Sequence, residues 1–187
     1  MILVLVGKSS SGKDTLMKEL VNNNIFAGVI STTSRPIREK ELNNIDYYFT
    51  STDEFINKIE NNEFIEYRMY DTKLNDINEI WYYGTEKKSI DCSVNSVLVL
   101  DVNGLKSIRK YFPNESIIGI YLHCPLNLRT ERAKNRGSFC EIEWNRRIQT
   151  DKIDFENVYT EVDYVLNGTK SVKELAQEVK DILKDSK

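Results

Sequence analysis

The 187-residue sequence is 40% hydrophobic and 29% charged, which is the composition of an ordinary globular protein. A chain of this length can bury a sizeable core and suits one domain, with or without inserted lids. Its formal net charge is −3, with lysines and arginines spread along the chain, so it lacks the basic footprint of a non-specific nucleic-acid binder.

The cysteines and the first apolar run indicate the compartment. Cys92, Cys124 and Cys140 are far apart and show no C-x-x-C spacing. This pattern argues against a disulfide framework or a zinc site and favours free thiols in a reducing compartment. The apolar run at residues 2–6 is too short for a signal peptide or a membrane span. We therefore expect a cytoplasmic protein that does not associate with membranes.

The chain begins with elements that are typical of a phosphate site. Residues 2–6 are apolar and β-branched, which predicts a strand buried on both faces. Residues 13–22 predict a helix, because Leu16 and Leu20 are spaced for one buried face. The segment between them, GKSSSGKD, matches the phosphate-loop pattern G-x-x-x-x-G-K-[ST] except at its last position, where Asp14 stands.

This loop predicts a binding site for a nucleoside triphosphate. The two glycines let backbone N–H groups point at phosphate oxygens, the helix N-terminus favours anions, and Lys13 would reach the terminal phosphates. Asp14 could serve Mg²⁺ directly or through water, or could be an acid favoured by the helix dipole. The candidate ATP-binding residues here are Gly7, Ser9, Ser10, Ser11, Gly12, Lys13, Asp14 and Thr15.

Residues 32–85 differ from the rest, because they are polar and rich in tyrosine. They predict a small subdomain inserted into the main sheet. Arg35 and Arg38 suit bidentate recognition of a second phosphate, and Glu66 could accept hydrogen bonds from a base edge that carries N–H groups. The expected elements are a strand at 28–31, a helix at 52–59 capped by Ser51 or Thr52, and extended segments at 64–70 and 81–83.

An alternation of strands and helices then follows, which implies a parallel sheet with right-handed crossovers. Asp101 ends an apolar strand, at the edge of a parallel sheet where ligands collect. It could hold Mg²⁺ in the Walker B manner, or it could be a turn residue. The expected strands are 96–101, 116–123 and 164–166, and the expected helices are 105–111, 126–134, 141–155 and 171–183.

Taken together, these segments resemble a guanylate kinase. The matching pieces follow the order of the family and cover nearly the whole chain: GKSSSGKDTL, STTSRPIREKE, IDYYFTSTDEF, NEFIEY, YYGT, LVLD, RAKNRG, NRRI and DYVLN. The resemblance implies one α/β domain over residues 1–187, with a P-loop NTPase-like parallel sheet and helices on both faces. Its core would be 1–31 and 86–187, its NMP-binding insert 32–85, and its lid about 136–146.

The resemblance also implies roles for individual residues. Those that would hold the acceptor phosphate are Ser31, Arg35, Arg38, Tyr47 and Tyr83. Those that would touch guanine are Glu66 and Thr85. The arginines that would close over the transferred phosphate are Arg132, Arg136 and Arg147, and Asn167 would lie near the donor adenine. Tyr47 and Tyr83 could instead be packing residues, and Arg132 and Arg136 could belong to a solvated helix face.

The sequence departs from the family pattern at four places. Asp14 replaces a hydroxyl residue, as in the ribose bisphosphate kinases of phosphonate metabolism. Residues 67–81 are longer than expected, which predicts an extended hairpin over the acceptor site. Asn103 replaces the second acid of L-D-x-D and would read the acceptor base less strictly, because an amide both donates and accepts. The last strand, DYVLNGT, lacks the acids that follow in the family.

The first hypothesis is ATP- and Mg²⁺-dependent phosphorylation of a nucleoside monophosphate, GMP or dGMP, by a monomer or homodimer. A second is a kinase of the same fold with another acceptor, either another NMP or a ribose bisphosphate. A third is a non-catalytic module of this fold that binds a phosphopeptide. The intact loop with Lys13 argues against the third.

Overall fold

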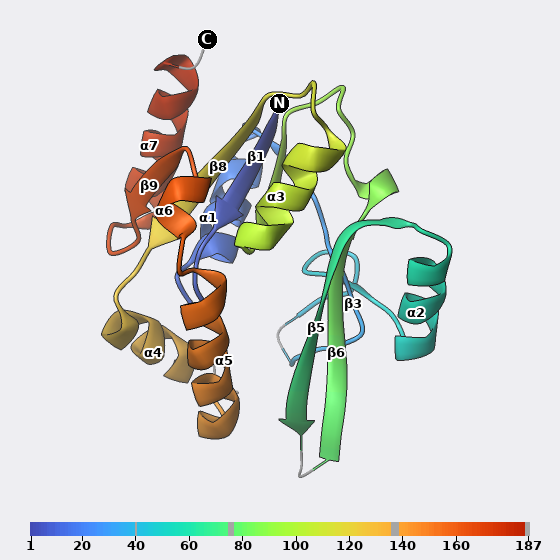
Figure 1. Cartoon of the computed structure of the whole chain (residues 1–187). Coiled ribbons are helices and arrows are strands. Elements are labelled where there is room, and N and C mark those ends of the chain that lie inside the picture. Colours follow the sequence, from blue (N-terminus) through green and yellow to red (C-terminus); the bar gives the residue numbers. More distant parts are fainter. Residues whose placement is uncertain (40, 75–76, 136–138, 186–187) are drawn as a thin grey trace. The chain divides into compact units, whose positions relative to one another are not determined.

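The computed structural model describes residues 1–39, 41–74, 77–135 and 139–185. The chain forms two compact units, coloured along the sequence in Figure 1. We call Met1–Gly28, Cys92–Lys106 and Asn114–Lys187 the core unit, and Val29–Asp91 and Ser107–Pro113 the insert unit. None of the helices in the described ranges is long and apolar enough to cross a bilayer.

The core unit is built on a parallel sheet of five strands in the order β2-β7-β1-β8-β9. The strands are β2 (Ala27–Gly28), β7 (Ser96–Leu100), β1 (Ile2–Val6), β8 (Ile117–His123) and β9 (Tyr164–Asn167). The helices are α1 (Lys13–Asn22), α4 (Leu126–Lys134), α5 (Glu141–Asp154), α6 (Val158–Glu161) and α7 (Val172–Asp185), while α3 (Val102–Tyr111) begins here and ends in the insert unit. This arrangement confirms the predicted α/β fold with a parallel sheet flanked by helices.

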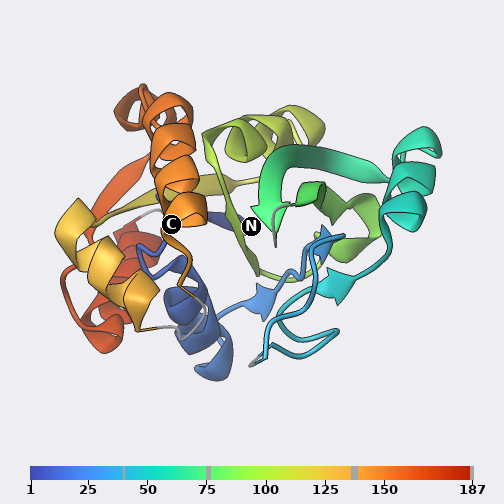
Figure 2. The same ribbon diagram turned by 90° about the horizontal axis from the view of Figure 1, so that it is seen from below.

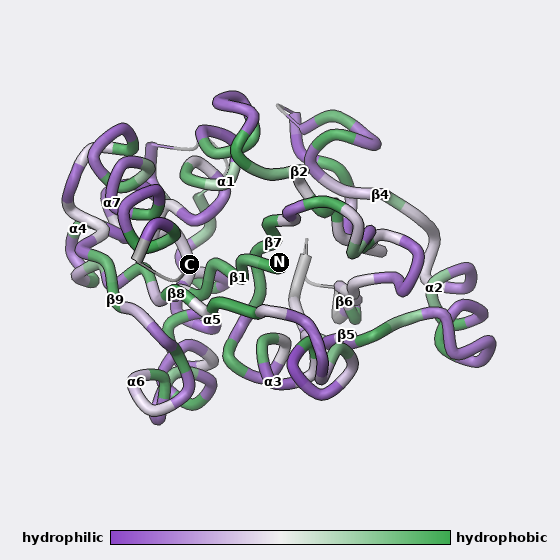
Figure 3. Tube along the Cα trace, turned by 90° about the horizontal axis from the view of Figure 1, so that it is seen from above, coloured by the Kyte–Doolittle hydropathy of each residue, from purple (hydrophilic) through white to green (hydrophobic). Residues whose placement is uncertain are grey.

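The core lies around β1, whose side chains are all buried. Successive strand residues point to opposite faces, so Leu3 and Leu5 share one face of the sheet. They pack there with Leu16 and Leu20 of α1 and with Val179 of α7. Figure 3 shows this strand as a hydrophobic segment at the centre of the core unit. Burial on both faces explains why a plain apolar run predicted β1 correctly.

The insert unit contains a second sheet, in the order β4-β3-β6-β5. Its strands are β3 (Thr32–Thr33), β4 (Tyr48–Phe49), β5 (Phe64–Leu74) and β6 (Ile77–Glu86), and it also holds α2 (Thr52–Glu60) and the 3₁₀ turn η1 (Lys87–Ser89). The antiparallel β5–β6 ladder runs out to the pair Leu74 and Ile77. The predicted extended hairpin is therefore confirmed, and its tip at 75–76 lies outside the described residues. That it covers the acceptor site stays a prediction.

Helix α2 packs on this second sheet. Ser51 caps it with a capping box, since its side chain accepts from the Glu54 N–H and the Glu54 carboxylate accepts from the Ser51 N–H. Phe55 is fully buried and stacks on Phe64 at 4.4 Å between ring centroids. The predicted cap and helix are thus confirmed, and α2 is fixed to the hairpin by an aromatic contact.

The structure corrects one predicted strand and adds a short helix. The strand expected at 28–31 is wrong, because the chain leaves the first sheet at Gly28 and enters the second at Thr32. The apolar residues of this segment connect one sheet to the other. A short apolar stretch of sequence looks the same whether it forms a strand or such a connection. The four-residue helix α6 was not predicted, because so short a segment shows no helical period.

A buried carboxylate links α2 to the second sheet. Glu86, whose side chain is 2% exposed, accepts from Thr32 Oγ1 at 2.6 Å and pairs with Lys58 of α2 and with Lys88. Burial alone would raise its pKa, but the hydrogen bonds from Lys58, Thr32 and Lys88 lower the pKa of Glu86 to about 2. The charged carboxylate therefore stabilises the insert unit above the ordinary glutamate pKa of 4.5.

Because the folded-state pKa of Glu86 is lowered, its contribution to stability should be lost as the pH falls from about 4.5 to about 2. We expect Glu86→Gln to lower the free energy of unfolding at pH 7 by roughly 1–3 kcal/mol and to flatten its acid dependence. Urea unfolding followed by Trp81 fluorescence in a Trp144→Phe background reports on this unit. Glu60→Gln, an exposed change on α2, is the control, and an unchanged acid slope in Glu86→Gln would contradict the assignment.

Candidate functional site

The predicted phosphate loop lies between β1 and α1 in the core unit. Gly12 adopts a left-handed φ of 107°, which favours glycine. A Cβ on Gly7 would lie 2.6 Å from Ser11 Oγ and 3.1 Å from the Leu122 carbonyl oxygen, so this position also favours glycine. Lys13 folds back over the loop, and its Nζ donates to the carbonyl oxygens of Gly7 at 2.5 Å and Lys8 at 3.2 Å. The ammonium group is thus already held at the loop where phosphates would bind.

The remaining residues predicted for the donor also belong to the core unit. Ser11 is buried, Ser9 and Ser10 are half-buried, and Asp14 and Thr15 are exposed in the first turn of α1. Asn167, exposed at the end of β9, accepts through Oδ1 from the N–H and the hydroxyl of Thr169. Its side chain therefore shapes the turn that follows β9.

Asp101 acts as a helix cap in this structure. Its Oδ1 accepts from the Gly104 N–H at 2.7 Å, in the first turn of α3. The predicted role of Asp101 as a Mg²⁺ ligand stays a prediction. Asn103 lies in the same turn and is exposed.

Of the predicted lid arginines, Arg132 contacts the phosphate loop directly. Its guanidinium donates to Ser11 O at 2.7 Å and to Gly168 O at 2.9 Å. It is half-buried and so does not belong to a solvated helix face. Arg136 lies outside the described residues, as do residues 137–138 of the predicted lid.

Arg147 lies in the first half of α5 and is held by a carboxylate on the same helix. Its Nε donates to Glu143 at 2.7 Å, and Glu143 also pairs with Arg146. Burial would raise the pKa of Glu143, but the hydrogen bonds from Arg146 and Arg147 lower that pKa to about 2. The carboxylate is therefore charged at neutral pH and holds the predicted transfer arginine by an ion pair.

In the insert unit, two of the predicted acceptor-phosphate residues meet at Glu41. Arg35 binds both Glu41 oxygens, at 2.8 and 2.9 Å, and its guanidinium lies 5.3 Å from the Tyr47 ring centroid. Arg38 pairs with the same carboxylate at 3.6 Å. The Tyr83 ring lies edge-on to Tyr47, with 6.0 Å between centroids. Two arginines thus bind one carboxylate, and the Tyr47 ring lies next to both Arg35 and Tyr83.

Arg35 is charged although it is only 3% exposed. Burial would lower its pKa, but the hydrogen bond to Glu41 and the nearby tyrosines raise the pKa of Arg35 overall. Glu41 was missed in the sequence, although its spacing from both arginines in RPIREKE could have suggested an ion pair. Ser31 is half-buried at the start of this segment, and its backbone carbonyl oxygen accepts from the Tyr48 N–H at 2.9 Å.

The predicted base-reading residues are neighbours across the hairpin. Glu66 of β5 pairs in register with Thr85 of β6, and Thr85 Oγ1 donates to Glu66 Oε1 at 2.7 Å. This hydrogen bond fixes one carboxylate oxygen. That Glu66 reads a base edge stays a prediction.

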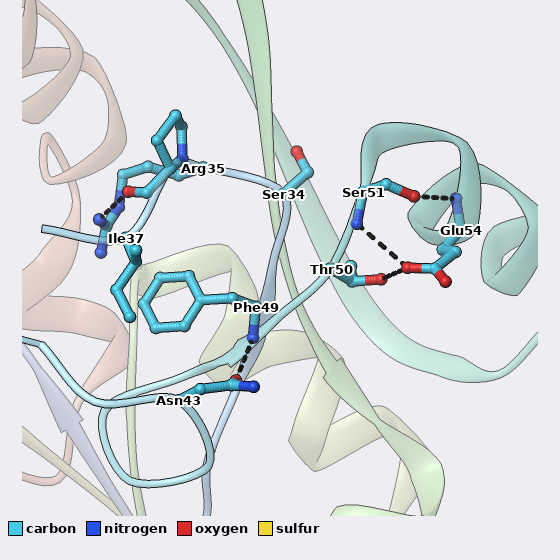
Figure 4. A pocket seen from close by; sticks show the side chains of 9 residues that line it. Ser34, Arg35, Ile37, Asn43, Phe49, Thr50, Ser51 and Glu54 are labelled. Atoms are coloured by element: carbon cyan, nitrogen blue, oxygen red, sulfur yellow. Dashed lines mark hydrogen bonds between the residues drawn. The ribbon is translucent and has the colours of Figure 1, made fainter.

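A pocket of about 460 Å³ lies beside the Arg35 segment, and Figure 4 shows it from close by. Of the predicted acceptor residues, only Arg35 lines it. On its other side, Thr50 and Ser51 are each hydrogen-bonded to Glu54 at the start of α2. One side of this hollow is thus formed by residues that cap a helix, and most of the predicted acceptor residues lie elsewhere.

Comparison with known proteins adds independent information. The family model for guanylate kinase matches residues 1–186. The guanylate kinase of Clostridium acetobutylicum is 32% identical over 171 residues, which cover 88% of this chain and 73% of that protein. The guanylate kinase of Rickettsia felis is 30% identical over 176 residues, which cover 90% of this chain and 85% of that protein. A crystal structure of guanylate kinase from Anaplasma phagocytophilum matches with a TM-score of 0.69 at 23% identity, covering 100% of this chain and 85% of that one.

Proposed function

This chain belongs to the guanylate kinase family, and from that membership we propose that it transfers the γ-phosphoryl group of ATP to GMP or dGMP. The observation that supports the proposal is that each unit gathers cationic groups of the kind that bind phosphate. The core unit holds a phosphate loop with its lysine in place, and the insert unit holds the Arg35–Tyr47–Tyr83 cluster.

In the proposed reaction, an oxygen of the acceptor monophosphate attacks the γ-phosphorus, the bond to the β–γ bridging oxygen breaks, and ADP leaves. The acceptor phosphate is already an anion, so no general base is needed. Catalysis then depends on positioning and on charge neutralisation. The loop amides and Lys13 would hold the donor phosphates, while Arg35 and Arg38 would orient the acceptor.

The residues present suit Mg²⁺ bound mainly through the nucleotide. Among the described residues, no three His, Cys, Asp or Glu side chains gather into a metal cage. Mg²⁺ usually takes one or two carboxylates together with substrate phosphates, and Asp14 and Asp101 could supply them. When bound, the ion would neutralise charge on the donor phosphates.

Guanine recognition is assigned to Glu66 and Thr85. Guanine presents N–H donors on its Watson–Crick edge, and a carboxylate accepts hydrogen bonds only. Asn103 would add an amide that both donates and accepts, which is less selective. Because of Asn103 and the long β5–β6 hairpin, we keep a different acceptor, another NMP or a ribose bisphosphate, as the second candidate.

A coupled ADP-release assay with ATP and Mg²⁺ tests the proposal. The acceptors are GMP, dGMP, AMP, CMP, UMP, dTMP and ribose 1,5-bisphosphate. We expect turnover on GMP and dGMP at a kcat/KM well above the others. Turnover mainly on another acceptor would support the second candidate. No turnover on any acceptor would favour a phosphopeptide-binding module.

Restoring an acid at Asn103 should sharpen the choice of base. We expect Asn103→Asp to raise the ratio of kcat/KM for GMP over that for AMP by roughly 10- to 100-fold, because hydrogen bonds to a charged acceptor are stronger. Asn127→Asp, the same change on the exposed face of α4, should leave the ratio as it is. An unchanged ratio in Asn103→Asp would show that this position does not face the acceptor base.

A further inference from the structure

A buried ion pair lies directly behind the phosphate loop. Arg129 of α4 and Asp151 of α5 meet at 2.8 Å, with side chains only 5% and 10% exposed. Figure 2 shows the two helices, in yellow and orange, beside the blue segment that carries the loop. Buried charges are costly unless they are paired and hydrogen-bonded, so this pair calls for an explanation that packing alone does not give.

Arg129 and Asp151 together form hydrogen bonds with every polar group of one loop residue, Ser9. The Ser9 N–H donates to both Asp151 oxygens, at 3.2 and 3.1 Å, and Ser9 Oγ donates to Oδ1 at 3.2 Å. Arg129 donates to the Ser9 carbonyl oxygen at 3.1 Å. The peptide groups on both sides of Ser9 are therefore held in one orientation by side chains from two different helices.

Asp151 also sets the position of α5. Arg147 lies four residues before it, so the two side chains share one face of the helix, about 6 Å apart along the axis. Trp144, buried on the same helix, lies 6.0 Å from the Arg129 guanidinium and adds a second contact between α4 and α5. If α5 is fixed to the loop at Asp151, the position of Arg147, one turn away on the same helix, is fixed as well.

We propose that Arg129 and Asp151 are positioning residues that fix α5 to the phosphate loop and thereby place Arg147 over the transferred phosphate. The role of Arg147 in this proposal rests on the proposed function. The anchoring of the loop rests on the contacts to Ser9. The two parts can therefore be tested separately.

Anchoring is tested without turnover. The double variant Arg129→Leu/Asp151→Ala removes both charges, so neither is left buried and unpaired. Hydrogen exchange by mass spectrometry should show at least tenfold faster exchange in the peptide that contains Ser9. Equal exchange in the variant and the wild type overturns the anchoring. If the double variant folds poorly by circular dichroism, Asp151→Asn, which keeps the shape and one acceptor oxygen, replaces it.

Positioning is tested by a double-mutant cycle on turnover of GMP. We expect the Arg129→Leu/Asp151→Ala variant to lower kcat about 100-fold, with KM for GMP nearly unchanged. When Arg147→Ala is added to this variant, the combined loss in kcat should be little larger than the loss caused by Arg147→Ala alone, because the pair acts through that arginine. Lys152→Ala, which removes an exposed charge from the same helix, is the matched control and should combine additively with the pair variant.

The outcomes separate the inference from the function. Additive losses with Arg147→Ala, or a wild-type kcat in the pair variant, overturn the positioning role. A wild-type protein that does not phosphorylate GMP contradicts the proposed function and with it the role given to Arg147. In that case faster exchange at Ser9 would still support the anchoring.

Discussion

Replacing Lys13 by alanine should reduce kcat/KM for ATP by on the order of 10²–10³-fold, because it removes a cation preorganised for the charge that develops on the phosphates. The structure gives the physical reason. Lys13 Nζ is bound by the Gly7 and Lys8 carbonyl oxygens, so its charge sits at the loop before any nucleotide arrives. Little reorganisation would be needed on binding.

The measurement is steady-state ADP release with GMP as acceptor. Lys18→Ala is the matched control, because it removes the same charge from an exposed position on the same helix. We expect the control to stay within about twofold of the wild type, because surface changes have small effects. If Lys13→Ala kept its turnover, phosphoryl transfer would not take place at this loop.

The parts of the fold that the sequence predicted well have a strong local cause. β1 and α1 were predicted to the residue, because one is a continuous apolar run and the other has its apolar residues at helical spacing. The cap at Ser51 follows from a local hydrogen-bond pattern in the same way. The crossing at 28–32 was mispredicted, because which sheet a residue joins is decided by tertiary contacts.

The residues that support the site were harder to find. Arg129 and Asp151 lie on helices rich in charged residues, where a buried pair looks like two solvated side chains. Their partner is Ser9, more than a hundred positions away along the chain. Motif reasoning finds groups that would touch the substrate, whereas the groups that hold those in place depend on the folded arrangement.

The acceptor half of the site gives the second large expected effect. Arg35→Ala should lower kcat/KM for GMP by on the order of 10²-fold or more, because two hydrogen bonds to a charged group are lost. KM for ATP should change little, since the donor site belongs to the core unit. The measurement is steady-state kinetics with each substrate varied in turn.

A buried ion pair complicates this prediction, because Arg35→Ala also leaves Glu41 without its main partner. Glu41→Gln separates the two effects, since it removes the carboxylate charge and keeps the arginine. If Arg35 binds the acceptor phosphate, Glu41→Gln should cost much less than Arg35→Ala in kcat/KM. If Arg35 only stabilises the insert unit, the two variants should lose activity equally and should unfold alike by Trp81 fluorescence in the Trp144→Phe background. A larger loss in Arg35→Ala at equal stability would identify the guanidinium itself as the group that orients the acceptor.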